Sequence, residues 1–116
     1  NDTSLAFDGA GVPYLAYKNW TASQTEIKKR VAGNWTSVTI PAGASGSPQI
    51  KSFGGTIYLL AGHFDGISVW RLDGSAWVRV ALAHTYAIRY TFGVDSAGSV
   101  WLLYGDSSGA WYIRKF

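Results

Sequence analysis

The chain contains three imperfect copies of one unit about 43 residues long, and this repeat limits the folds that it can adopt. Each copy holds a strand-like segment, a turn that contains glycine and a second strand-like segment with an aromatic anchor. The anchors are Tyr14, Tyr58 and Trp101, about 44 and 43 residues apart. Later in the unit, a glycine turn precedes a strand that opens on Trp35 or Trp77. This period is typical of a four-stranded antiparallel β unit, as in a β-propeller blade.

Alternating and continuous apolar segments place the strands within each unit. The second strand of each unit carries a near-continuous apolar run, as strands buried on both faces do. No segment has a sustained helical period, so we expect an all-β chain of about 2.75 units. The units are expected at residues 1–43, 44–84 and 85–116, and the third lacks a fourth strand. The predicted strands are 4–8, 13–18, 26–31 and 35–40, then 48–53, 56–61, 67–72 and 76–80, and finally 90–94, 99–104 and 110–116.

Composition excludes several classes of function. The chain has no cysteine, so it can form neither a disulfide framework nor a thiolate metal site. Apolar runs such as residues 100–104 are too short to span a bilayer, which predicts no membrane insertion. The net charge of +3 comes mostly from scattered basic residues, and the one cluster, Lys28 to Arg30, would alternate between the faces of a strand. Without a coherent basic groove, nucleic-acid binding is not expected.

The turn and strand pattern resembles a known class of repeat. Residues 8–11 and 95–98 read Asp-x-x-Gly, residues 14–17 read Tyr-Leu-Ala-Tyr, and a Gly-x-Trp turn follows at residues 33–35. This pattern is similar to the degenerate blades of bacterial surface and secreted β-propellers, including sialidase-like and lectin-like ones. Residues 95–98 also resemble the sialidase Asp box, but the Thr-Trp that closes that motif is missing. The resemblance therefore implies a propeller fold and does not carry sialidase chemistry to this chain.

Propellers have four to eight blades around a channel, so the fewer than three complete blades of this chain cannot close a ring alone. We therefore expect the ring to be completed either by further copies of the chain, as a homo-oligomer, or by blades that lie outside it.

Few residues are candidates for catalysis. Asp8, Asp73 and Asp95 fall in repeated turns, where capping the turn is the expected role. Asp65 and Asp106 follow second strands and form the one plausible acid pair, which keeps a propeller glycosidase as an alternative. Two isolated histidines do not predict a metal site or a catalytic triad, and we expect no cofactor and no catalytic residue.

The loops that follow the second and fourth strands would emerge on one face of a propeller. They bring aromatic side chains next to short polar ones, which suits a sugar because its C–H face stacks on a ring while its hydroxyls form hydrogen bonds. The leading hypothesis is a non-catalytic, lectin-like carbohydrate-binding module, secreted or displayed on a cell or virion surface. A structural scaffold without a ligand is a further alternative. The predicted ligand-binding residues are Asn19, Trp20, His63, Phe64, Asp65, Tyr86, Asp106 and Ser107.

Overall fold

The computed structural model describes residues 3–85 and 87–116, and within these ranges the chain forms strands and no helix. The first sheet contains β1 (Thr3–Phe7), β2 (Pro13–Asn19), β3 (Gln24–Val31) and β4 (Asn34–Val38). The second contains β5 (Ser45–Phe53), β6 (Thr56–His63), β7 (Gly66–Asp73) and β8 (Ala76–Ala83). The third contains β9 (Arg89–Val94), β10 (Val100–Gly105) and β11 (Trp111–Lys115). Neighbouring strands within each sheet are antiparallel and follow one another in the chain.

Three tight turns are held by the same side-chain interaction. Asp8, Asp95 and Asp106 each accept hydrogen bonds from the backbone N–H groups two and four residues later, over 2.9 to 3.2 Å. In each turn the fourth residue is a glycine with a positive φ, between 79° and 89°. Short polar side chains that bond to their own backbone stabilise turns of this kind. The turn-capping role predicted for Asp8 and Asp95 is thus observed.

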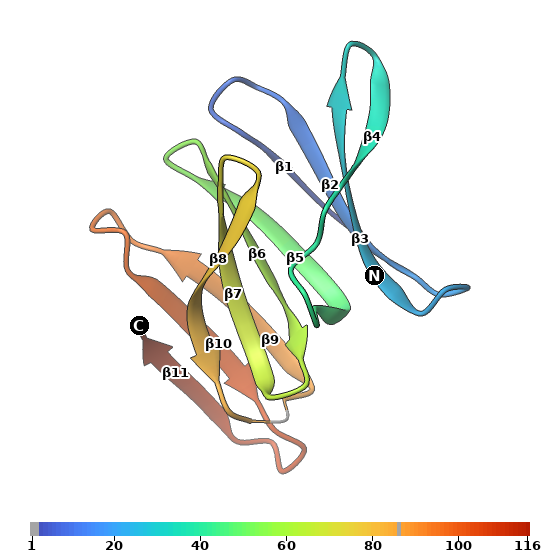
Figure 1. Ribbon diagram of the computed structural model, residues 1–116. Coiled ribbons are helices and arrows are strands. Elements are labelled where there is room, and N and C mark those ends of the chain that lie inside the picture. The colour runs from blue at the N-terminus through green and yellow to red at the C-terminus, as the bar shows by residue number, and fades with distance from the viewer. Residues whose placement is uncertain (1–2, 86) are drawn as a thin grey trace.

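The second sheet lies between the other two, which cover its two faces (Figure 1). On β6 the side chains alternate between these neighbours, because successive residues of a strand point to opposite faces. Ile57 and Leu59 pack in the cluster shared with the first sheet, whereas Tyr58 and Leu60 pack in the cluster shared with the third. The continuous apolar run of β6 therefore reflects burial on both faces.

The outer sheets correct one expectation about the second strands. On β2 and β10, buried residues alternate with partly or fully exposed ones, because each outer sheet has a neighbour in this chain on one face only. The fourth strand of the second unit also differs, since β8 continues past residue 80 to Ala83. Two of the added residues, Ala81 and Ala83, are buried against the third sheet, and this packing accounts for the longer strand.

Every predicted strand overlaps an observed one, and the expected antiparallel sheets of short strands are present. The arrangement of these sheets as propeller blades stays a prediction. No helix of the described residues is long and apolar enough to cross a membrane.

Candidate functional site

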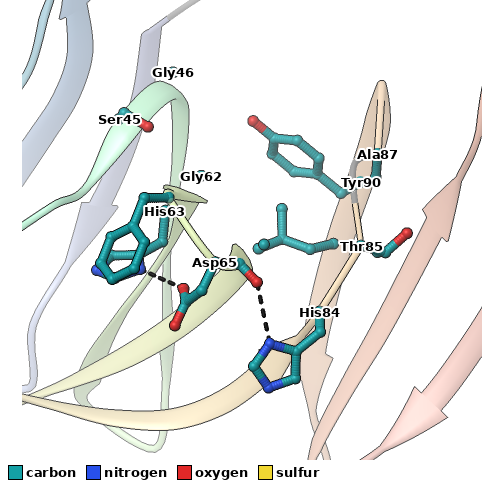
Figure 2. A pocket seen from close by; sticks show the side chains of 12 residues that line it. Ser45, Gly46, Gly62, His63, Asp65, His84, Thr85, Ala87 and Tyr90 are labelled. Atoms are coloured by element: carbon teal, nitrogen blue, oxygen red, sulfur yellow. Dashed lines mark hydrogen bonds and ion pairs between the residues drawn. The ribbon is translucent and has the colours of Figure 1, made fainter.

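A pocket of about 600 Å³ opens where the second and third sheets meet. Three segments form it: the start of β5, the turn from β6 to β7, and the connection from β8 into β9. Figure 2 shows His63 and Asp65 on one side of this pocket, with Thr85 and Tyr90 on the other. The lining residues are Ser45, Gly46, Gly62, His63, Phe64, Asp65, Gly66, Ile67, His84, Thr85, Ala87 and Tyr90.

The turn from β6 to β7 presents an almost fully exposed aromatic side chain at the pocket. His63 pairs with Gly66 across the hairpin, which leaves Phe64 and Asp65 as a two-residue turn. Gly66 has a φ of +142°, and a side chain there would collide with the backbone carbonyl of Ala83. The tight turn holds the Phe64 ring 90% exposed, with its centroid 4.4 Å from that of the His63 ring. An apolar ring is thus displayed at the rim of the pocket.

Asp65 carries the negative charge of the site. Its carboxylate bonds to Nδ1 of His63 and lies 3.5 Å from Nη1 of Arg79, while its backbone oxygen lies 3.2 Å from Nδ1 of His84. Partial burial opposes ionisation, but the hydrogen bond from His63 and the charges of His63 and Arg79 outweigh it, so the pKa of Asp65 lies below its ordinary value. At neutral pH Asp65 is therefore an ionised hydrogen-bond acceptor.

His63 is held within the protein by both ring nitrogens. Nδ1 contacts Asp65, and Nε2 lies 3.2 Å from the carbonyl oxygen of Ala42, in the loop before β5. A side chain on the neighbouring Gly43 would collide with the imidazole, so the loop packs closely on it. His63 therefore positions Asp65 and Phe64, whereas His84 and Thr85 bring an imidazole and a hydroxyl from the opposite segment.

Asn19 and Trp20 lie at a different turn, between β2 and β3. The Asn19 side chain accepts hydrogen bonds of 3.1 Å from the backbone N–H groups of Thr21 and Ala22 and donates one of 2.8 Å to Glu26. The Trp20 ring is exposed and has Nζ of Lys18 4.0 Å from its centroid. Asn19 thus shapes its own turn, and Trp20 is displayed there and does not line the pocket.

Asp106 and Ser107 line a separate, smaller pocket of 110 Å³ at the turn from β10 to β11. Besides capping this turn, the Asp106 carboxylate accepts hydrogen bonds from the Ser108 hydroxyl at 2.5 Å and the Tyr112 hydroxyl at 3.2 Å. Asp65 and Asp106 therefore line different pockets, and the acid pair of the glycosidase alternative shares no pocket among the described residues. Tyr86, also predicted at the site, lies outside the described residues.

Sequence reasoning did not select Ser45, His84 or Tyr90 as ligand-binding residues, yet all three line the pocket. Tyr90 sits on β9, and its hydroxyl donates a 3.5 Å hydrogen bond to the carbonyl oxygen of Ser47. For these three residues, the one signal in the sequence was the position of His84 in the segment that connects the second and third units. In residues 3–85 and 87–116, no group of three His, Asp or Glu side chains could hold a metal ion.

No model of a known protein family matches the chain, and no curated protein matches it in sequence. Among solved structures, the fold is similar to that of a fucose lectin from Kordia zhangzhouensis, determined in complex with methyl-fucoside. The match has a TM-score of 0.66 at 15% sequence identity, and it covers 98% of this chain and 91% of that one. At this identity the likeness concerns the fold.

Proposed function

We propose that the chain is a non-catalytic carbohydrate-binding module and that the pocket between the second and third sheets is its binding site. The observation that carries this proposal is the Phe64 ring, exposed at the rim beside the ionised Asp65. A sugar ring can stack its C–H face on Phe64 while its hydroxyls donate to Asp65. Ser45 and Thr85 add hydroxyl groups that can donate or accept.

The size and charge of the pocket suit a small saccharide. Its volume of about 600 Å³ falls in the range of small-molecule sites, which run from about 300 to 1,000 Å³. A site with one stacking ring predicts weak binding of a single sugar, and repeated sites would raise the avidity. The fold likeness to a fucose lectin supports a lectin and makes fucosides the first ligands to test.

The wider setting of the module is also part of the proposal. We take the three sheets as consecutive propeller blades that belong to an oligomer or to a larger propeller. The stacking of each sheet on the next in chain order supports this arrangement. A glycan-binding role further suggests a protein that is secreted or displayed at a surface.

Titration of the chain with methyl-fucoside by calorimetry, together with a glycan array, tests the proposal. We expect Phe64→Ala to weaken binding roughly fivefold, because it removes the stacking ring, worth about 1 kcal/mol. Its ring is exposed, so folding should be unaffected.

Trp20→Ala is the matched control, since it removes an exposed aromatic ring from another turn and should leave binding unchanged. If Trp20→Ala abolishes binding and Phe64→Ala does not, the site lies at the turn from β2 to β3 instead. If no glycan is bound, the proposed function is wrong.

A further inference from the structure

Three large apolar side chains are exposed on the outer face of the third sheet. Trp101, Leu103 and Ile113 project from it and are 38%, 37% and 65% exposed. Leu103 and Ile113 are direct cross-strand partners on β10 and β11, so their side chains are neighbours on one surface. Such a contiguous apolar surface is typical of an interaction site.

The repeat shows what equivalent positions do in the other two sheets. In the first sheet, Ala16 of β2 pairs with Ile27 of β3; in the second, Leu60 of β6 pairs with Val69 of β7. These pairs occupy the same place in the unit as Leu103 and Ile113. The first pair packs against the second sheet, and the second pair packs against the third.

The anchor aromatics follow the same rule. Tyr14 is buried against the second sheet and Tyr58 against the third, whereas their counterpart Trp101 is exposed. We call this side of a sheet its leading face, defined in the third sheet by Trp101, Leu103 and Ile113. The leading faces of the first two sheets are covered by the next sheet in the chain.

The opposite side of the first sheet, its trailing face, has the complementary property. Leu5 pairs with Leu15 on this face, just as Ile50 pairs with Leu59 in the second sheet and Phe92 with Leu102 in the third. The pairs of the second and third sheets are buried against the preceding sheet. Leu5, in contrast, is 55% exposed, and the exposed Phe7 lies further along the same strand face.

We infer that copies of this chain associate head to tail, with the leading face of the third sheet packed on the trailing face of the first sheet of a second copy. This contact would continue the packing that already joins the sheets within the chain, at the same positions of the unit. The two surfaces differ, so the contact is heterologous and can be repeated from copy to copy. The inference extends the proposed blade arrangement and does not depend on sugar binding.

Two single substitutions on opposite faces test the inference in the full chain. Ile113→Glu places a charge on the leading face, and Leu5→Glu places one on the trailing face. Multi-angle light scattering of the unsubstituted chain should give a mass of at least two chains of 12.6 kDa each. Each variant alone should give the mass of a single chain, because one half of every contact is blocked.

Mixing the two variants distinguishes head-to-tail packing from a symmetric dimer. The Ile113→Glu chain keeps an intact trailing face and the Leu5→Glu chain an intact leading face, so an equimolar mixture should form a 1:1 dimer. A symmetric contact between leading faces would leave the Leu5→Glu chain dimeric by itself, which would overturn the inference.

Val31→Glu is the control, because Val31 is exposed at the end of β3 and shares the strand face of Ile27, on the side of the first sheet opposite to its trailing face. We expect it to associate like the unsubstituted chain, and circular dichroism should show that all variants are folded. A monomeric unsubstituted chain would overturn the inference. Sugar binding is measured separately, so the failure of either proposal can be recognised without the other.

Discussion

Gly66 closes the turn that carries Phe64 and Asp65, and its backbone leaves no room for a side chain. In a Gly66→Ala variant the new methyl group would collide with the Ala83 carbonyl, in a region of positive φ that side chains disfavour. We expect a loss of about 3 kcal/mol in the free energy of unfolding, from the strained backbone and the overpacking together. Urea unfolding measures this loss.

Gly98→Ala provides the comparison for that measurement. Gly98 also has a positive φ, of +82°, but no atom lies within 4 Å of the position that a Cβ would take. Only the conformational cost remains, about 1 kcal/mol. Equal losses for the two variants would contradict the steric role of Ala83.

The turn at Asp106 makes stability depend on pH. The hydrogen bond from the Ser108 hydroxyl, supported by backbone N–H groups and Tyr112, lowers the pKa of Asp106 against the opposing effect of burial. A carboxyl group whose pKa is lowered in the folded state stabilises the fold above its unfolded pKa, near 3.8. This contribution is lost as the pH falls below that value.

Asp106→Asn tests this dependence, because the amide oxygen can still accept the turn hydrogen bonds but cannot ionise. We expect the variant to be less stable than the unsubstituted chain at pH 7, and the difference to shrink as the pH falls below about 4. Urea unfolding at pH 7 and pH 3 would show this change. A difference that is constant with pH would contradict it.

Strands β6 and β10 carry the same repeat position in opposite environments. Leu60 is completely buried between the second and third sheets, whereas its counterpart Leu103 is 37% exposed on the outer face. We expect Leu60→Ala to cost about 3 kcal/mol in unfolding free energy, the usual result of a core cavity. Leu103→Ala should cost less, about 1 kcal/mol in dilute solution, because the side chain is already partly exposed in the single chain.

Association should also appear in the thermal stability of the chain. If the folded chain binds further copies of itself, mass action raises its melting temperature with protein concentration. We expect about a hundredfold increase in concentration to raise the Tm by roughly 5 °C. In the Leu5→Glu variant the Tm should not depend on concentration, and differential scanning calorimetry would check both statements.

The strands and turns were predictable because their causes are local. The hydrogen bonds of Asp8 and Asp95 reach residues two and four positions later, and the glycines that allow a positive φ lie within the same turns. Strand periodicity is read over a few neighbouring residues. The sequence by itself therefore determined the all-β class and the position of each strand.

Only the tertiary structure decided which side chains share a site. Phe64 and Asp65 are neighbours in sequence, but Ser45 and Tyr90 reach their pocket from β5 and β9. Asp106, which has a similar place in its own unit, lines another pocket because no fourth sheet of the described chain packs beside it.

The physical reason is that turn chemistry acts within a few residues, whereas a pocket depends on how separate sheets dock. That docking is set by burial of whole faces, such as the two faces of β6. The repeat specifies which positions can form such a face, and the neighbouring sheet decides whether each face becomes core, pocket or exposed surface.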